Sequence, residues 1–175
     1  MIKEVLLLLI LSFIPFTTYA DEYDIAVEAY NSGDYDKAFP IYEKLALSGD
    51  VDAQADLGIM YVQGYGVSKD ISEAVKWWTK AADMGNNKAQ GYLGGIYSSE
   101  TSGLLNHKKA FKYYSLSAKQ NDAISQSILG YMYAEGQGVE KDINKAIELW
   151  QKSAKSGNEG AIKNLNHARK LGLIE

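Results

Sequence analysis

The sequence contains no cysteine and only two prolines, Pro15 and Pro40, among its 175 residues. The lack of cysteine excludes disulfides, thiolate metal sites and a cysteine nucleophile. The scarcity of proline leaves room for many helices, because proline interrupts a helix more strongly than any other residue. His107 and His167 are the only histidines, and neither has a partner at ligand spacing. We interpret both as surface residues, and we expect no metal, no cofactor and no catalytic base.

Basic residues are not gathered into one stretch of the chain. The 18 Lys and Arg are spread among 22 Asp and Glu, which gives a net charge of −4 and an isoelectric point of about 5.3. Proteins that bind nucleic acid normally present a basic face, so we expect no nucleic-acid partner. No Gly-x-Ser-x-Gly elbow occurs, and the glycine loops at 64–66 and 136–138 do not continue into a P-loop. The sequence therefore predicts no catalytic residues and a protein that is not an enzyme.

An apolar run from Val5 to Phe16 lies near the start of the chain. Lys3 precedes the run, and the small residue Ala20 follows it, just before two acidic residues. This order is typical of a secretory signal peptide, which predicts that residues 1–20 are removed by cleavage after Ala20. The alternative is a membrane anchor, but the run is shorter than the about 20 apolar residues that span a bilayer. We expect a mature chain, residues 21–175, that is periplasmic or secreted and has no stable membrane anchor.

The rest of the sequence repeats with a period of 36 residues. Four aligned positions recur in four copies: Ala38, Ala74, Ala110 and Ala146; Tyr42, Trp78, Tyr114 and Trp150; Ala46, Ala82, Ala118 and Ala154; Gly49, Gly85, Asn121 and Gly157. A Leu-Gly pair followed by tyrosine recurs in three copies, at 57–61, 93–97 and 129–133. The period divides the chain into units at about 21–50, 51–86, 87–122 and 123–158, followed by a cap at 159–175.

Each unit is expected to form two helices. Residues 71–82 place their apolar side chains at helical spacing, so they form one buried face. An Asp or Asn that can cap this second helix recurs four residues before the aligned alanine, at Asp34, Asp70, Asn106 and Asp142. Glu73 gives Asp70 the spacing of a capping box, and the aligned Gly or Asn121 suits the helix end. A glycine inside the first helix costs about 1 kcal/mol against alanine, so we expect each Leu-Gly glycine to lie against the aromatic residue of the second helix.

These residues resemble the Sel1-like repeat (SLR) family, a relative of the tetratricopeptide repeats. The resemblance is carried by Leu57-Gly58, Tyr61, the loop 64–67, Lys69-Asp70, Trp77-Trp78 and the segment 81–85, and it returns at 123–158. It implies an all-α fold: a right-handed α-α superhelix, or solenoid, of about four helical hairpins plus a C-terminal capping helix. The unit at 87–122 departs from the pattern because it lacks the Gly-x-Gly-Val loop. The unit at 21–50 is closer to a plain tetratricopeptide repeat, as end repeats often are.

The resemblance also implies a concave face, lined by the first helix of each unit, where a partner binds. Counting from the Leu-Gly pairs, we expect nine partner-binding residues: Asp52, Ile59, Val62, Gln63, Lys88, Ser99, Ile124, Tyr131 and Glu135. This face has no Lys and Arg clamp for an acidic peptide end. Four aromatic residues lie off the core pattern and are further candidates for a contact surface: Tyr65, Trp77, Tyr92 and Tyr131.

Together these features predict an exported bacterial protein-protein interaction module, a scaffold or adaptor that binds another protein and is itself a monomer. Two alternatives remain open. A periplasmic immunity or inhibitor protein that blocks a secreted toxin also fits a compact, acidic, exported repeat protein. A hydrolase such as a β-lactam-acting enzyme fits less well, because the chain has neither cysteine nor a recognisable nucleophile and base pair.

Overall fold

The computed structural model describes residues 19–175, which form nine α-helices and a single 3-10 helix, η1, and contain no strand. The elements are α1 (Tyr19–Asn31), α2 (Tyr35–Leu47), α3 (Val51–Gln63), α4 (Ile71–Asp83), α5 (Asn87–Ser98), η1 (Glu100–Ser102), α6 (His107–Lys119), α7 (Ala123–Glu135), α8 (Ile143–Lys155) and α9 (Glu159–Lys170). The expected signal peptide, residues 1–20, lies almost wholly outside the described residues.

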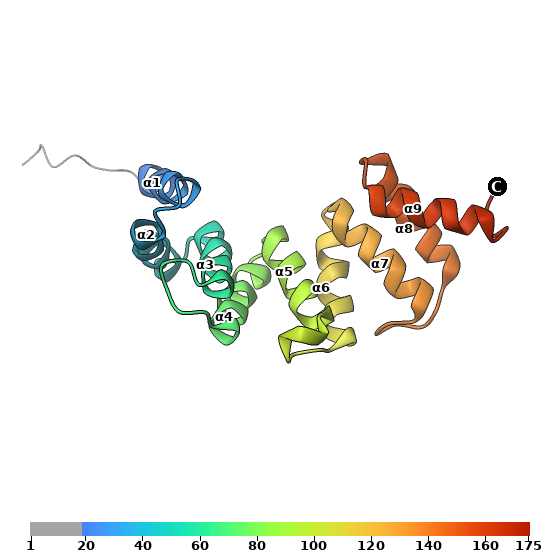
Figure 1. Cartoon of the computed structure of the whole chain (residues 1–175), viewed down its shortest axis with the longest axis horizontal. Helices are drawn as coiled ribbons and strands as arrows, with labels where there is room; N and C mark the ends of the chain where they lie inside the picture. The colour runs from blue at the N-terminus through green and yellow to red at the C-terminus, as the bar shows by residue number, and fades with distance from the viewer. Residues whose placement is uncertain (1–18) are drawn as a thin grey trace, which may run out of the picture.

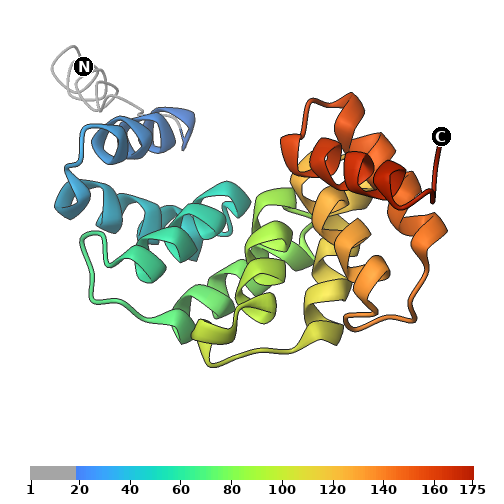
Figure 2. The same cartoon turned by 45° about the vertical axis from the view of Figure 1, so that its right-hand side comes forward.

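The helices form four antiparallel hairpins, α1/α2 to α7/α8, and α9 follows the last of them (Figure 1). All extensive contacts join helices that follow one another in sequence. The stack curves into a crescent whose ends, α1 and α9, rise on the same side (Figure 2). The predicted all-α right-handed superhelix of four hairpins and a final helix is confirmed. None of the helices within 19–175 has the length and apolar character that crossing a bilayer requires.

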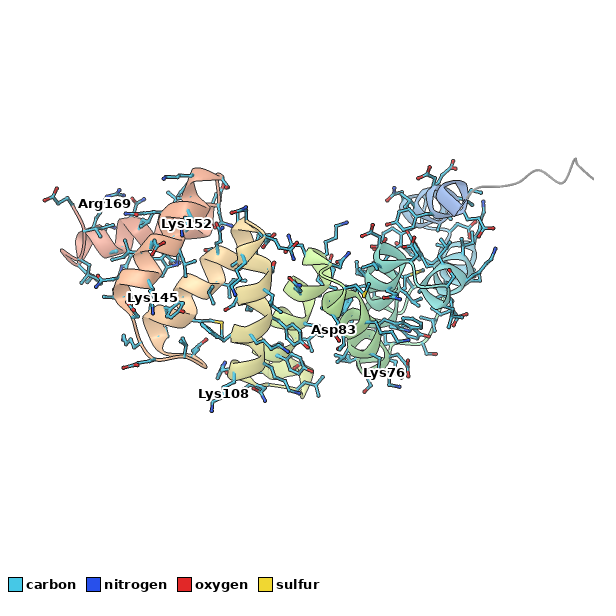
Figure 3. All side chains as sticks on the ribbon, turned by 180° about the vertical axis from the view of Figure 1, so that it is seen from behind. Lys76, Asp83, Lys108, Lys145, Lys152 and Arg169 are labelled. Atoms are coloured by element: carbon cyan, nitrogen blue, oxygen red, sulfur yellow. The ribbon has the colours of Figure 1, made fainter. Side chains whose placement is uncertain are left out.

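The predicted helix boundaries are set by the expected capping residues. The side chains of Asp34, Asp70, Asn106 and Asp142 each accept a hydrogen bond from the backbone N–H three residues later. The capping box at Asp70 is incomplete, because the Glu73 carboxylate binds Lys76 instead of the Asp70 N–H. Lys145 and Lys152 likewise bind carboxylates within one helical turn, on the outer surface shown from behind in Figure 3.

The even-numbered helices end at the predicted glycines. Gly49, Gly85 and Gly157 have φ values of +99°, +89° and +81°, in the left-handed region that glycine adopts without strain. Asn121 takes the same role in the third hairpin with φ of 65°, and it is the single non-glycine residue with positive φ within 19–175.

The second, third and fourth hairpins are each closed by a glycine that lies against an aromatic ring. A methyl group on Gly94 would lie 2.7 Å from Tyr114 Cδ1, and one on Gly130 would lie 2.6 Å from Trp150 Nε1. Gly58 is pressed against Trp78 in the same way. The predicted close approach of the paired helices is therefore confirmed. The indole groups of Trp78 and Trp150 also donate hydrogen bonds to the carbonyls of Ala55 and Ser127, at 2.9 and 3.1 Å.

Successive hairpins are joined by a buried glutamine that repeats every 36 residues. The side-chain amides of Gln54, Gln90 and Gln126 donate to the carbonyls of Ala46, Ala82 and Ala118, at 3.2 to 3.3 Å. Each bond runs from an odd-numbered helix to the last turn of the preceding even-numbered helix. The glutamines therefore fix the register of one hairpin on the next, a role that the sequence analysis did not assign.

Candidate binding surface

The odd-numbered helices α3, α5, α7 and α9 form one continuous face of the stack, here called the groove face. Two hollows lie on it. The central pocket, between α5 and α7, has a volume of about 290 Å³, and the terminal pocket, between α7 and α9, has a volume of about 560 Å³. Volumes of this size suit a small molecule or one or two side chains of a partner.

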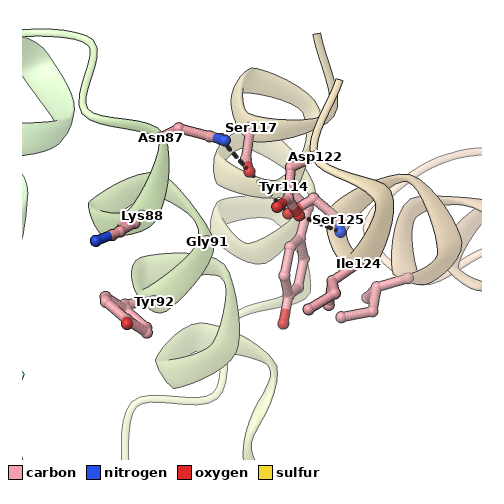
Figure 4. Close-up of a pocket in the computed structure, with 10 residues that line it drawn as sticks. Asn87, Lys88, Gly91, Tyr92, Tyr114, Ser117, Asp122, Ile124 and Ser125 are labelled. Carbon is pink, nitrogen blue, oxygen red and sulfur yellow. Dashed lines mark hydrogen bonds between the residues drawn. The ribbon is translucent and has the colours of Figure 1, made fainter. Parts of the chain in front are cut away.

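The central pocket has an apolar wall and a polar floor (Figure 4). Tyr92 of α5 and Ile128 of α7 belong to the wall, and Ile124 stands at the rim with 62% of its surface exposed. In the floor, the buried Ser117 hydroxyl donates to Asn87 Oδ1 at 2.6 Å and accepts from Ser125 at 2.8 Å. The floor is therefore internally satisfied, which leaves the wall and rim for contacts with a ligand.

The third hairpin carries smaller residues than its neighbours at two positions of α5, one of which lines the central pocket. Gly91 occupies the position of Ala55 and Ser127, 36 residues away on either side. Gly95 occupies the position of Ile59 and Tyr131. A methyl group on Gly91 would meet no atom closer than 3.8 Å, so this glycine is not required by packing and simply leaves space.

The nine predicted partner-binding residues do not form a single site. Lys88 and Ile124 line the central pocket, and Tyr131 and Glu135 line the terminal pocket. Gln63 is exposed at the end of α3, outside both pockets.

The remaining four predicted residues have structural contacts. Asp52 accepts a hydrogen bond from Asn86 at 2.9 Å, on the next odd-numbered helix. Ile59 and Val62 are half-buried against the central core cluster. The Ser99 hydroxyl lies 2.9 Å from that of Thr101 in η1. None of these four residues lines either pocket, and Asp52 alone among them is exposed.

Two of the four aromatic residues predicted to form a contact surface are instead part of the core. Trp77 is only 9% exposed and packs in the N-terminal core cluster. Tyr65 stacks on Tyr35 with ring centroids 3.9 Å apart. The prediction for Trp77 is wrong because α4 buries a second apolar side chain: Trp77 packs in the N-terminal core cluster, while Trp78 packs in the central one. Tyr92 and Tyr131 are exposed on the groove face, as expected.

The interpretation of His107 as a surface residue is also wrong. His107 begins α6 beneath the loop after α7, where Gly138 lies against its carbonyl. The side chain is half-buried, and its Nδ1 atom is buried without a hydrogen-bond partner among the described residues. His167 is exposed on α9, where it lines the terminal pocket. Within 19–175, no cluster of three or more His, Asp or Glu side chains is arranged to hold a metal ion.

A half-buried carboxylate, Asp56, lies on the groove face and was not anticipated. The Tyr23 hydroxyl donates to Asp56 Oδ2 at 2.7 Å, which ties α1 to α3. Burial raises the pKa of the Asp56 carboxyl above its usual range, and the hydrogen bond from Tyr23 partly offsets this. The period could not reveal this residue, because the aligned positions hold Tyr92, Ile128 and Asn164.

Comparison with known proteins gives consistent matches along the chain. A family model described as the Sel1 repeat matches residues 51–86, 88–122 and 123–158. The crystal structure of a protective antigen from uropathogenic Escherichia coli, described as displaying an SLR fold, matches with a TM-score of 0.81 and 35% identity. That match covers 87% of this chain but 34% of the other, so the chain spans about a third of the length of that protein.

Two further structures extend the comparison. A Sel1 repeat protein from Oxalobacter formigenes matches with a TM-score of 0.81 and 31% identity, over 94% of this chain and 69% of its own. Cysteine rich protein B of Helicobacter pylori matches with a TM-score of 0.54 and 23% identity, over 83% of this chain and 96% of its own, which shows a shared fold alone. No curated protein matches the sequence.

Proposed function

Since the chain belongs to the Sel1 repeat family, we propose that it is an exported interaction module that binds a protein partner through the groove face. Solenoids of stacked hairpins typically bind partners along an extended surface that several repeats share. The observation that carries the proposal is the pair of pockets on this face, with Ile124 and Tyr131 exposed at 62% and 47% beside them. Aromatic and aliphatic side chains around a hollow are typical of the centre of a protein interface.

The contacts of the central pocket favour binding over catalysis. A serine nucleophile needs a base within hydrogen-bond reach. Ser117 and Ser125 bind each other and Asn87, so their recorded side-chain partners include no base. The only lysine among the lining residues is Lys88, at the rim of the pocket. We therefore propose a role that depends on shape and apolar contact.

Export is the second part of the proposal. It is supported by the apolar run that precedes Ala20 and by the description of the 35% identical Escherichia coli protein as a protective antigen. Mass spectrometry of the protein recovered from its native cells tests this part. We expect a mature chain that begins at Asp21 in the periplasmic or extracellular fraction, whereas a cytoplasmic chain that begins at Met1 would contradict export.

Binding is tested by affinity capture from the native organism with two matched double variants. Ile124→Ala with Tyr131→Ala truncates the exposed side chains of the groove face. The control variant, Leu47→Ala with Met84→Ala, truncates two side chains that are 71% and 72% exposed. They lie at the end of α2 and directly after α4.

We expect the groove-face variant to recover its principal partner with affinity reduced about tenfold or more, since interface anchors typically contribute more than 1 kcal/mol each. The control variant should bind as the parent protein does. Circular dichroism checks that both variants remain helical. Equal recovery by both folded variants would reject the groove face as the binding surface.

A further inference from the structure

The terminal pocket is explained by comparing it with the equivalent junction two repeats earlier. Each lining residue has a counterpart 72 residues before it in the sequence. Three large residues of the earlier junction, Val62, Tyr92 and Ile96, are replaced in the terminal pocket by Ala134, Asn164 and Ala168. The cavity of about 560 Å³ lies beside these three smaller residues, although four other lining residues are larger than their counterparts: Tyr131, His167, Leu171 and Leu173.

One of the three large residues of the earlier junction is an aromatic ring stacked on a tryptophan. The Tyr92 ring lies over Trp78 with centroids 5.0 Å apart and an interplanar angle of 29°. The counterpart of Trp78 is Trp150, which lines the terminal pocket, but the counterpart of Tyr92 is Asn164. No ring among residues 19–175 stacks on Trp150, which is 6% exposed because the C-terminal core cluster covers most of it.

We propose that the terminal pocket binds an aromatic side chain of the protein partner, which occupies the position of Tyr92 at the earlier junction and contacts the part of Trp150 that lines the pocket. This inference rests on the proposed function and specifies the chemistry of the partner. The two tryptophans are held alike, by an indole hydrogen bond to the odd-numbered helix and by a glycine against the ring. Trp150 is therefore fixed before the ligand arrives, which lowers the entropic cost of binding.

The surroundings of Trp150 suit an aromatic ring. Leu171 and Leu173 follow α9 at the edge of the pocket and remain exposed, and Ile143 and Ala168 complete an apolar lining. An entering ring would cover these side chains and remove their apolar surface from water.

The charged groups of the rim define the flanks of the partner segment. Glu135 at the end of α7 and Lys141 in the following loop both line the pocket, and neither forms an ion pair with another residue of 19–175. Charge complementarity therefore favours an aromatic residue flanked by one basic and one acidic residue. A second copy of this chain fits poorly, because its exposed aromatic residues in the described part, Tyr92 and Tyr131, have no charged neighbours in sequence.

The test uses small probes and the indole N–H signals of the ¹⁵N-labelled full chain. The probes are N-acetyl-tyrosine amide, N-acetyl-leucine amide and the capped tripeptides Lys-Tyr-Glu and Glu-Tyr-Lys. We expect the tyrosine probe to shift the Trp150 signal and to bind about three- to tenfold more tightly than the leucine probe. One tripeptide should bind a further two- to fivefold more tightly, and the charge-reversal variant Lys141→Glu should abolish that gain.

Filling the pocket supplies the decisive variant. Asn164→Tyr with Ala168→Ile restores the residue types of the earlier junction and should abolish probe binding while the protein stays folded. Met84→Ala, at an exposed position outside the groove face, is the control and should leave probe binding unchanged. The proposal is overturned if no probe shifts Trp150, if the leucine probe binds as tightly as the tyrosine probe, or if the filled variant still binds.

Probe binding and partner capture together separate this inference from the proposed function. In one outcome, capture of the partner depends on Ile124 and Tyr131 while no probe shifts the Trp150 indole signal. That result rejects only the aromatic pocket. If the probes bind as expected but no partner depends on the groove face, the proposed function fails and the pocket stands. Self-association in sedimentation that the filled variant abolishes would identify a second copy as the occupant and overturn the proposal of a separate partner.

Discussion

Neighbouring glycines in α5 have different relations to their surroundings. A methyl group on Gly94 would lie 2.7 to 2.8 Å from three atoms of the Tyr114 ring. A methyl group on Gly95 would meet only the Tyr114 hydroxyl, at 3.7 Å, which is ordinary contact. Both residues have helical φ values, so backbone conformation does not require glycine at either position.

We expect alanine substitutions at these two positions to have opposite effects. Gly94→Ala should lower the free energy of unfolding by about 1–3 kcal/mol, because the helices must separate to admit the methyl group. Gly95→Ala should raise it by about 0.5–1 kcal/mol, since alanine loses less conformational entropy than glycine in a helix. Urea denaturation followed by circular dichroism measures both. Equal destabilisation by the two substitutions would show that α5 tolerates no added side chain on either face.

Buried tyrosines at the N-terminal end make stability depend on alkaline pH. Burial raises the pKa of the Tyr23 and Tyr42 phenols well above the ordinary value of 10.0, and the nearby Asp56 carboxylate raises both further. Above pH 10 the unfolded chain releases these protons while the folded chain retains them. Their contribution to stability is therefore complete below pH 10 and is lost as the pH rises further.

The free energy of unfolding should fall from about pH 10 upward, by at most about 1.4 kcal/mol per pH unit for each such tyrosine and by less for the partly exposed Tyr23. Tyr42→Phe removes one of these groups and should reduce the slope by that amount. Tyr42 makes no hydrogen bond recorded among the described side chains, so the substitution should have little effect at pH 7. Denaturation curves at several pH values test this, and an unchanged slope would place the alkaline sensitivity elsewhere.

At the scale of the helices, the repeated glutamines differ in how fully they are satisfied. The side-chain carbonyl of Gln90 accepts a hydrogen bond from Gln120 at 2.9 Å. The equivalent oxygen of Gln54 is buried without a partner among the described residues. An unsatisfied buried carbonyl is costly, so the same hydrogen bond to the preceding helix gives less net stability at Gln54.

Replacing each glutamine with methionine preserves its approximate volume and removes its polar groups. Gln90→Met should lower the free energy of unfolding by about 1–2 kcal/mol, because it removes both hydrogen bonds of Gln90, while Gln120 keeps only its bond to the Gly85 carbonyl. Gln54→Met should cost about 0.5 kcal/mol or less, because the loss of the unsatisfied oxygen offsets the loss of the bond. Thermal and urea unfolding of the two variants provide the comparison. A larger loss at Gln54 would indicate that its oxygen is bonded to water.

Most helices could be predicted from the sequence because their determinants repeat. The capping residues, the closing glycines and the glycine-aromatic contacts all recur every 36 residues, so each copy supports the interpretation of the others. Asn121 illustrates the strength of this comparison. Its left-handed conformation was predicted from its alignment with three glycines that close helices, and its φ is 65°.

The candidate site could be predicted only in part, because it depends on positions that do not repeat. Gly91 opens the central pocket where its counterparts are larger, and Asn164 leaves the terminal pocket without a ring. Counting inward-facing positions identified Lys88 and Tyr131 but could not show which neighbours leave space. The useful signal is a difference in side-chain size between equivalent positions of the repeats. A search for the repeat period treats such differences as mismatches and discards them.

At the scale of the whole molecule, the core is divided along the stack rather than gathered at one centre. The central cluster extends from α3 to α7, and smaller clusters lie toward each end. Contacts join mainly sequential helices, so stability is expected to be a sum of local terms. The ends of such a stack open more easily than its middle.

Helix α9 should therefore exchange its amide hydrogens through local opening, at a lower free energy than α5, α6 and α7. It makes extensive contact only with α8, and one of its three buried residues, Ala168, lines a pocket of about 560 Å³. Filling that pocket with Asn164→Tyr and Ala168→Ile should bury apolar surface and slow exchange in α9 about tenfold, equivalent to about 1.4 kcal/mol. Exchange in α5 should stay unchanged, because stabilisation spreads weakly beyond the neighbouring hairpin. Hydrogen exchange with mass spectrometry measures both helices at once, and uniform slowing along the chain would show that the stack unfolds as a single cooperative unit.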